Sequence, residues 1–313
     1  MPTVTVSPQT TDTIMMIRPA NFGYNAQTAE SNAFQSDDQS LHPADITERA
    51  KAEFDEMVAR LREVGIKVLV IDDTEEPRRY DAVFPNNWIT MHHNGMVITY
   101  PLTAPSRRLE RREDILTHLA IDFKVTEVIR LEEHEQVGKY LEGTGSMILD
   151  RANNYAYACL SPRTHEELLL RFCTYFDCEP VVFTAVDAEG QQIYHTNVMM
   201  CMAETFVVIC MESVHNAQEK TRLYEVFERT GKEVVEISYT QMLRFAGNML
   251  QVRNTSGDRF LVMSTQAYNS LTPEQVSQVE SHCAILHSPI PTIETYGGGS
   301  ARCMMAEVFL EER

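Results

Sequence analysis

The segment GGGSARC at residues 297–303 combines the only glycine run of the chain with a cysteine close to the C-terminus. A cysteine thiolate is a strong nucleophile, and glycines let the backbone approach closely and present N–H groups to a developing oxyanion. This pattern favours Cys303 as the nucleophile of a covalent reaction. The alternative is an ordinary buried cysteine, which is the usual state of a free thiol.

The segment belongs to a repeat that runs along the whole chain. Turns rich in small residues, each leading into a strand or hairpin, start near residues 84, 141, 194, 245 and 297, so the spacing is close to fifty residues. Amphipathic helices are expected at residues 45–64, 106–119, 162–176, 216–229 and 273–286, and β-rich runs follow them from residues 67, 125, 179, 233 and 289. One helix, strand and hairpin unit therefore recurs five times.

Such a period indicates units stacked around an axis, because one unit cannot bury its apolar face alone. The sequence predicts a single α/β domain over residues 1–313, closed as a ring. The strand at residues 13–19 would complete the circuit with the last unit, and residues 20–44 would form a long loop near the site.

Equivalent turns of such a ring can converge on its axis. Their unusual contents are Asn86 and Asn87, Glu142, His195 and Asn197, Gly247 and Asn248, and Cys303. A thiol, an imidazole, a carboxylate and polar binders are the parts of a nucleophilic site. Each residue also has a plain structural reading, as a turn residue, a loop glutamate or a hydrogen-bonded histidine.

These pieces, in this order, resemble the guanidino-group-modifying enzymes: the amidinotransferases, arginine deiminases and dimethylargininases. The turns FPNN, LEG, HTN and the glycine run before a near-terminal cysteine carry the resemblance. The segments MIRPANFGYN, FPNNW, YHTNVMM and GGGSARCMM are most similar to those of the citrulline-utilisation hydrolases. The resemblance implies a five-bladed α/β propeller (pentein), with Cys303 as nucleophile, His195 as general acid and base, and Glu142 as its partner.

Two positions depart from the family pattern. Related deiminases hold the cationic guanidinium with two aspartates, where this chain has Asn87 and Asn197. A buried guanidinium without anionic partners costs several kcal/mol, whereas a neutral ureido group needs the donors and acceptors that carboxamides supply. The substrate is therefore expected to be a ureido amino acid such as citrulline.

Further residues are expected to bind substrate. Asn86, Gly298 and Gly299 are candidates beside the two asparagines. The substrate carboxylate needs a cation, for which Arg18, Arg107, Arg108, Arg111 and Arg244 are available. Arg107 or Arg108 is preferred, because related enzymes carry an arginine after the first turn.

Composition limits the setting of this chemistry. A net charge of −18 argues against nucleic-acid and anionic-membrane partners, and no segment has the length of a membrane span or the pattern of a secretory signal. Seven scattered cysteines suit a reducing compartment, so a cytoplasmic protein is expected. No metal or cofactor is required, the partner is a small molecule, and a homodimer is possible by family analogy.

The leading hypothesis is a hydrolase that converts citrulline to ornithine, carbon dioxide and ammonia by cysteine catalysis. The alternatives are a deiminase or dihydrolase of arginine or an acylated arginine, and a catalytically silent propeller that binds an amino acid.

Overall fold

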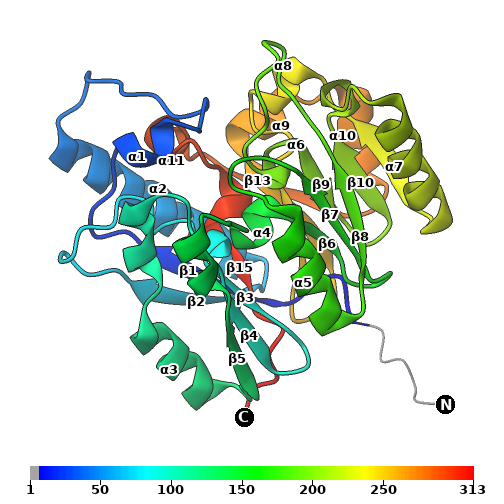
Figure 1. Cartoon of the computed structure of the whole chain (residues 1–313). Helices are drawn as coiled ribbons and strands as arrows, with labels where there is room; N and C mark the ends of the chain where they lie inside the picture. The colour runs from blue at the N-terminus through cyan, green and yellow to red at the C-terminus, as the bar shows by residue number, and fades with distance from the viewer. Residues whose placement is uncertain (1–6) are drawn as a thin grey trace.

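Five three-stranded sheets form the framework of the computed structural model, which describes residues 7–313 (Figure 1). In every sheet the central strand pairs antiparallel with one neighbour and parallel with the other. The strands of each sheet follow in spatial order, starting with the edge strand that pairs antiparallel. They are β15 (Ala306–Glu307), β1 (Thr13–Arg18) and β2 (Lys67–Asp72); β3 (Ile89–Met91), β4 (Met96–Thr99) and β5 (Glu127–Arg130); β6 (Ile148–Asp150), β7 (Tyr155–Cys159) and β8 (Glu179–Phe183); β9 (Met200–Met202), β10 (Phe206–Ile209) and β11 (Glu233–Glu236); and β12 (Leu250–Arg253), β13 (Arg259–Ser264) and β14 (Ala284–Ser288). The fold is α/β, with one sheet for each expected repeat.

Helices connect the two parallel strands of each sheet, since parallel neighbours need a crossover connection. These helices are α2 (Pro43–Glu63), α3 (Glu113–Asp122), α5 (Glu166–Phe176), α7 (Ala217–Arg229) and α10 (Pro273–Glu280). Shorter helices are α1 (Ala26–Ala29), α8 (Tyr239–Met242), α9 (Thr265–Ser270) and α11 (Pro291–Gly297). Each hairpin therefore shares a sheet with the β-rich run of the next repeat. The unit read from the sequence, in which a helix and a strand precede their own hairpin, is shifted by one hairpin relative to the sheets.

Strand β1 joins the two ends of the chain. It pairs in parallel with β2 and antiparallel with β15, where Met15 lies opposite Ala306. The prediction that the leading strand combines with the last unit is confirmed.

The five turns lie next to one another. They are η1 (Pro85–Asn87), α4 (Gly143–Ser146), α6 (Thr196–Met199), the loop at Gly247 and Asn248, and η5 (Ala301–Met304). Helix α4 contacts both η1 and α6, and η5 contacts η1. A side chain at Gly247 would collide with the α6 backbone, and Asn248 accepts the N–H of Arg302 at 3.1 Å. The turns thus form a closed series of neighbours, which brings residues distant in sequence together.

Helix α2 illustrates how the crossovers are held. Its apolar stripe, Phe54, Met57, Val58 and Leu61, is buried as the periodicity predicts. Full burial of such a side chain stabilises the fold by roughly 1.5–3 kcal/mol. Pro43 occupies the first turn, where its missing N–H costs nothing.

The expected helix at residues 106–119 is interrupted. The structure has the 3₁₀ segment η2 (Pro105–Glu110), extended residues Arg111 and Arg112, and then α3. Arg107 and Glu110 turn inward as a buried ion pair of 2.7 Å. Of the four arginines at residues 107–112, this pairing buries Arg107, while the other three remain partly exposed.

The expected strand at residues 289–294 is wrong. Helix α10 ends at Glu280, six residues earlier than predicted, and β14 follows it directly. The PIPTIE segment instead begins α11, with Pro291 in its first turn. The carboxylate of Glu53 accepts the N–H groups of Thr292 and Ile293 at 2.9 and 3.0 Å, which satisfies the start of this helix.

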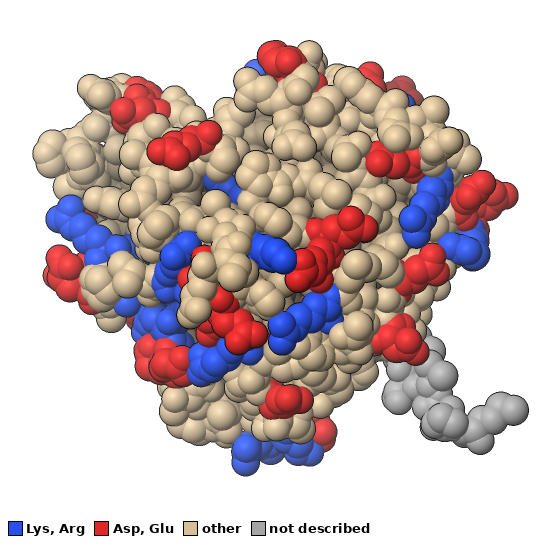
Figure 2. Space-filling model, viewed as in Figure 1, with Lys and Arg blue, Asp and Glu red and all other residues tan. Residues whose placement is uncertain are grey.

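Charges of both signs are mixed on the face shown in Figure 2, chiefly over its lower half. Ion pairs of the described surface include Arg130 with Glu113 at 2.8 Å and Lys67 with Glu312 at 2.7 Å. Exposed pairs of this kind contribute about 0–1 kcal/mol each to stability. Among residues 7–313, none of the helices combines the length and apolar composition of a membrane span.

Candidate active site

Cys303 lies in η5, only 4% exposed, behind the glycine turn. Gly298 has a φ of 61°, in the left-handed region that favours glycine. A Cβ on Gly297 would come 2.7 Å from Cζ of Phe84, so a side chain there would displace the buried Phe84 ring. The glycine run therefore allows the close approach and the backbone angles expected from the sequence.

The sulfur of Cys303 is contacted by two carboxamides. Nδ2 of Asn197 and Nδ2 of Asn248 each lie 3.3 Å from Sγ. Oδ1 of Asn248 lies farther away, at 3.6 Å. Both asparagines are buried, and they come from the third and fourth turns.

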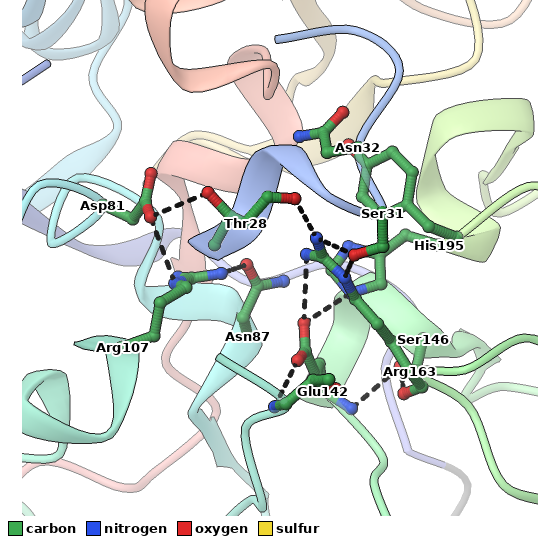
Figure 3. A network of polar contacts seen from close by, with 12 residues as sticks. Thr28, Ser31, Asn32, Asp81, Asn87, Arg107, Glu142, Ser146, Arg163 and His195 are labelled. Atoms are coloured by element: carbon green, nitrogen blue, oxygen red, sulfur yellow. Dashed lines mark hydrogen bonds and ion pairs between the residues drawn. The ribbon is translucent and has the colours of Figure 1, made fainter. Parts of the chain in front are cut away.

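His195 and Glu142 form a direct pair, with Nε2 and Oε2 2.8 Å apart (Figure 3). The other carboxylate oxygen, Oε1, accepts the N–H of Thr103 at 2.8 Å, and Nη1 of Arg163 lies 3.6 Å from Oε2. Burial alone would raise the pKa of Glu142, but Arg163 and the bond from His195 outweigh burial and hold that pKa well below its usual range. Glu142 is thus a carboxylate that fixes one imidazole nitrogen.

His195 is neutral at physiological pH. Burial lowers its pKa to about 4, which outweighs the opposing effect of Glu142, and Arg163 and Arg107 add to the lowering. Nε2–H then donates to Glu142, and Nδ1 is the basic nitrogen. Burial and two nearby guanidinium groups thus disfavour the charged ring in the resting state.

His195 and Cys303 line the same cavity, together with Gly297, Gly298 and Gly299. The free volume is about 20 Å³, enough for about one water molecule. Thr28 and Asn32, from the long loop expected near the site, also line this cavity. A molecule much larger than water can enter only if some of these lining residues move.

Hydrogen bonds from Arg163, Asn25, Asn32 and Gln35 hold the cover segment, residues 25–35, over the site, and Figure 3 shows those from Arg163. Arg163 donates to the carbonyl of Thr28 at 2.8 Å and to Ser31 Oγ at 2.7 Å. Asn25 donates to Asp81 at 2.6 Å, Asn32 to the carbonyl of Gly298 at 3.2 Å, and Gln35 to the carbonyl of Tyr296 at 2.9 Å. The cover is therefore tied both to the charged groups of the site and to the glycine turn.

The orientation of Asn87 is fixed by its neighbour. Arg107 donates to Asn87 Oδ1 at 2.7 Å, and its guanidinium also binds Glu110 through two nitrogens, at 2.9 and 2.7 Å. An arginine can only donate, so the oxygen of the Asn87 amide must face it. Nδ2 therefore points the other way, toward Gly145 and His195, where glycine leaves room for it.

Several amide atoms of the turns are buried without a partner. Asn87 Nδ2, Asn197 Oδ1 and both polar atoms of the Asn86 side chain make no hydrogen bond within the described residues. A buried unpartnered polar atom costs about 1–3 kcal/mol. Asn87 lines the cavity and its Nδ2 is a donor without a partner, whereas Asn197 contacts the lining residue Cys303 and its Oδ1 is an acceptor without a partner.

The structure separates the candidate arginines. Arg107 lines the cavity, whereas Arg108 pairs with Glu135 at 3.1 Å and does not reach it. Arg18 is paired with Asp55 at 2.8 Å on an exposed face, away from the cavity. The remaining two, Arg111 and Arg244, bind Glu135 and Gln266.

Arg163 is the functional candidate that sequence reasoning missed. It follows β7 in the chain, and its guanidinium carbon lies 4.8 Å from the centre of the Tyr194 ring. It sits in an irregular turn without helical or strand periodicity, so the sequence offered no signal. Asp81, which also lines the cavity, was missed for the same reason. Across residues 7–313, no group of three or more His, Cys, Asp and Glu is placed to hold a metal ion.

Several solved structures share this fold. The arginine dihydrolase ArgZ of the cyanobacterial ornithine–ammonia cycle superposes with a TM-score of 0.73 at 16% identity, over 95% of this chain and 40% of that one. Its substrate-bound N-terminal domain gives a TM-score of 0.72 at 16% identity, over 95% and 97%. A dimethylarginine dimethylaminohydrolase adduct gives 0.65 at 13% identity, over 94% and 98%. The chain thus spans about 40% of full-length ArgZ and nearly all of its N-terminal domain.

At the sequence level, no curated protein matches the chain. The profile described as eukaryotic N,N dimethylarginine dimethylhydrolase matches residues 18–310. The chain therefore belongs to the dimethylarginine dimethylhydrolase family of guanidino-group-modifying enzymes and is a hydrolase of carbon–nitrogen bonds.

Proposed function

We propose that this enzyme hydrolyses the ureido group of an amino acid, with citrulline as the substrate and ornithine, carbon dioxide and ammonia as products. Cys303 is the nucleophile, His195 moves the protons, and Glu142 orients His195. We further propose that the five sheets are the blades of one α/β propeller domain whose hub carries the site. The closed series of turns supports this arrangement.

The observation that carries the substrate proposal is the 2.7 Å bond from Arg107 to Asn87 Oδ1. It leaves Nδ2 of Asn87 as a donor toward the reacting group. A ureido group offers a carbonyl oxygen that accepts such a bond. A guanidinium has only N–H groups on its outer edge, so a donor directed at it finds no acceptor.

Asn197 complements this choice. Its Nδ2 is held by the sulfur of Cys303, so its unpartnered Oδ1 accepts from the ureido NH₂. One donor and one acceptor match a neutral group that has one oxygen and one terminal NH₂. Two carboxylates, as in the enzymes that hold a guanidinium, would instead select a cation.

The charged residues that line the cavity match the other end of an amino acid. Arg107 and Arg163 are the cations for the α-carboxylate, and Asp81 is the anion for the α-ammonium group. In this structure Asn25 and Thr28 donate hydrogen bonds to the Asp81 carboxylate at 2.6 and 3.5 Å. Because these partners belong to the cover, we expect substrate to exchange its own contacts for theirs.

The reaction begins with transfer of the thiol proton to Nδ1 of His195. The sulfur attacks the ureido carbon, and Asn87 Nδ2 donates to the oxygen as negative charge develops there, a contribution typically of about 10²–10³-fold. Nδ1–H protonates the substrate side-chain nitrogen, the C–N bond breaks, and ornithine leaves a carbamoyl thioester. Water then gives a proton to Nδ1 and attacks the carbonyl carbon. The C–S bond breaks, Nδ1–H returns its proton to the sulfur, and the released carbamic acid decomposes to carbon dioxide and ammonia.

Purified enzyme incubated separately with citrulline, arginine and succinylarginine tests the substrate assignment. Ornithine and ammonia are measured, with Cys303→Ser as the matched control. We expect ornithine from citrulline in the wild type and none from the variant. Absence of ornithine from citrulline, with turnover of either other compound, would refute the assignment.

Arginine dihydrolysis is the second candidate. The structural similarity includes an arginine dihydrolase domain covered over 97% of its length, and Asp81 supplies one carboxylate in the cavity. Arginine as the better substrate in the same assay would favour it.

The seven free cysteines support the expected reducing compartment.

A further inference from the structure

Because His195 is neutral, its imidazole offers no positive charge to the sulfur of Cys303. Two neutral donors take that place, because the amide nitrogens of Asn197 and Asn248 both contact Sγ at 3.3 Å. Hydrogen bonds to an anion are roughly twice as strong as those between neutral groups, and donation to a charged form favours that form. Removing one donor should therefore affect the thiolate more than the thiol.

The orientation of Asn248 follows from the structure. Its Oδ1 accepts the backbone N–H of Arg302 at 3.1 Å, and its Nδ2 also donates to the carbonyl of Asn197 at 3.0 Å. Exchange of the two amide atoms would set N–H against N–H and oxygen against oxygen. Nδ2 is thus committed to the side on which the sulfur lies.

The turn that carries Asn248 is built for this placement. Phe245 has a φ of 62°, which is costly for a bulky residue, and its ring packs on Phe34 at a centroid distance of 5.3 Å. Gly247 lies so close to α6 that a side chain would collide with the backbone of Met199. Asn248 itself is 1% exposed.

We propose that Asn248 is a catalytic residue that, with Asn197, donates hydrogen bonds to the thiolate of Cys303 and stabilises it when the thiol proton passes to Nδ1 of His195. Ionisation breaks the S–H bond and forms the Nδ1–H bond, so the site as a whole keeps its charge. The two amide donors then face a full negative charge on sulfur. This inference rests on the proposed role of Cys303 as nucleophile.

Asn248→Asp is the most direct test. It keeps the shape of the side chain and an oxygen for the Arg302 N–H, but it replaces the donor to sulfur with an acceptor. Asn94→Asp makes the same chemical change in the exposed β3–β4 turn and serves as the control. Asn248→Ser removes the donor contact without adding charge, and thermal unfolding checks that each variant folds.

Thiolate absorbance near 240 nm is followed against pH, and the curve of the matching Cys303→Ser protein is subtracted to isolate this sulfur. We expect the midpoint to move to higher pH by at least one pH unit in Asn248→Asp and in the same direction in Asn248→Ser. Iodoacetamide labelling of the Cys303 peptide at neutral pH should slow by about 10- to 100-fold. Asn94→Asp should match the wild type in both measurements.

Unchanged midpoints in folded Asn248 variants would overturn the inference, even if the wild type converts citrulline. Neither measurement uses a substrate, so a shifted midpoint in an enzyme inactive on citrulline would refute the proposed function and leave the amide contacts to the thiolate in place. If an Asn248 variant does not fold, Asn197→Ser takes its place in the comparison. The same shift of the thiolate midpoint to higher pH is expected for it.

Discussion

The guanidinium of Arg107 lies 2.7 Å from Oδ1 of Asn87 and turns the nitrogen of that amide toward Gly145 and His195. The contact joins the 3₁₀ turn η1 to the interrupted helical segment η2, and Glu110 holds Arg107 from the other side. A donor placed in this way distinguishes an acceptor group from a cation. Under the proposed function, the preference for a ureido over a guanidino substrate therefore depends on Arg107, which acts through Asn87.

Replacement of Asn87 by Asp tests this role. The carboxylate presents an acceptor where the ureido oxygen needs a donor, so kcat/KM for citrulline should fall by about 10²–10³-fold, while the ratio of arginine to citrulline turnover rises. Ornithine release from each substrate gives both values. Asn216→Asp, at the exposed N-cap of α7, should leave both unchanged, because aspartate caps a helix as well as asparagine does. An unaltered substrate ratio in the Asn87 variant would contradict the assigned role.

Glu142→Gln should lower kcat by about 10²–10⁴-fold. The carboxylate keeps the proton on Nε2 of His195, and a glutamine can donate to that nitrogen and stabilise the opposite tautomer. Single-turnover kinetics with citrulline provide the measurement. If the variant keeps wild-type kcat, Glu142 does not set the tautomer.

The pH dependence of kcat/KM should reflect the buried histidine. Since the pKa of His195 is lowered to about 4, the basic imidazole persists through weakly acidic solution. The acid limb of the profile should therefore lie near pH 4 to 5, below the value of about 6.5 for a free histidine. A profile that declines with a midpoint near 6.5, in protein that remains folded, would show that the imidazole is not desolvated in the working enzyme.

Glu294, in the helix before the glycine turn, should make stability depend on pH. Ser300 donates to its carboxylate at 2.6 Å, and burial raises its pKa to about 7. Between pH 4.5 and 7 the folded state keeps a proton that the unfolded chain releases, so this contribution is present in acid and lost as pH rises. Relative to the wild type, Glu294→Gln should thus gain up to about 3 kcal/mol between pH 4.5 and 8.

Urea unfolding at several pH values measures this effect. Glu225→Gln on the exposed face of α7 is the matched control and should show no pH-dependent difference from the wild type. A constant difference between Glu294→Gln and the wild type over this range would mean that Glu294 ionises normally in the folded protein.

The sequence predicted the positions of the five turns because each carries a local signature: small residues, a break in periodicity and a following strand. The same spacing located Cys303, His195 and Glu142, and the structure brings the last two into direct contact. Helix α2 and the capping box of α10 were predictable, since apolar spacing and cap chemistry are local properties.

What the sequence could not reveal depends on contacts between distant segments. Arg163 is bound by Ser31 and Thr28, more than 130 residues earlier in the chain. The break near Arg111 follows from burial of the Arg107–Glu110 pair, and α11 begins where Glu53 supplies acceptors. The neutral state of His195 likewise results from burial and neighbouring charge, which periodicity does not encode.

The covalent intermediate offers the most direct test of the proposed chemistry. Enzyme mixed with citrulline is quenched in acid within one turnover, and the mass of the Cys303 peptide is measured beside that of the Cys303→Ser protein. A carbamoyl adduct on Cys303, absent from the variant, is the predicted result. An amidino adduct formed from arginine, with no adduct from citrulline, would contradict the proposal.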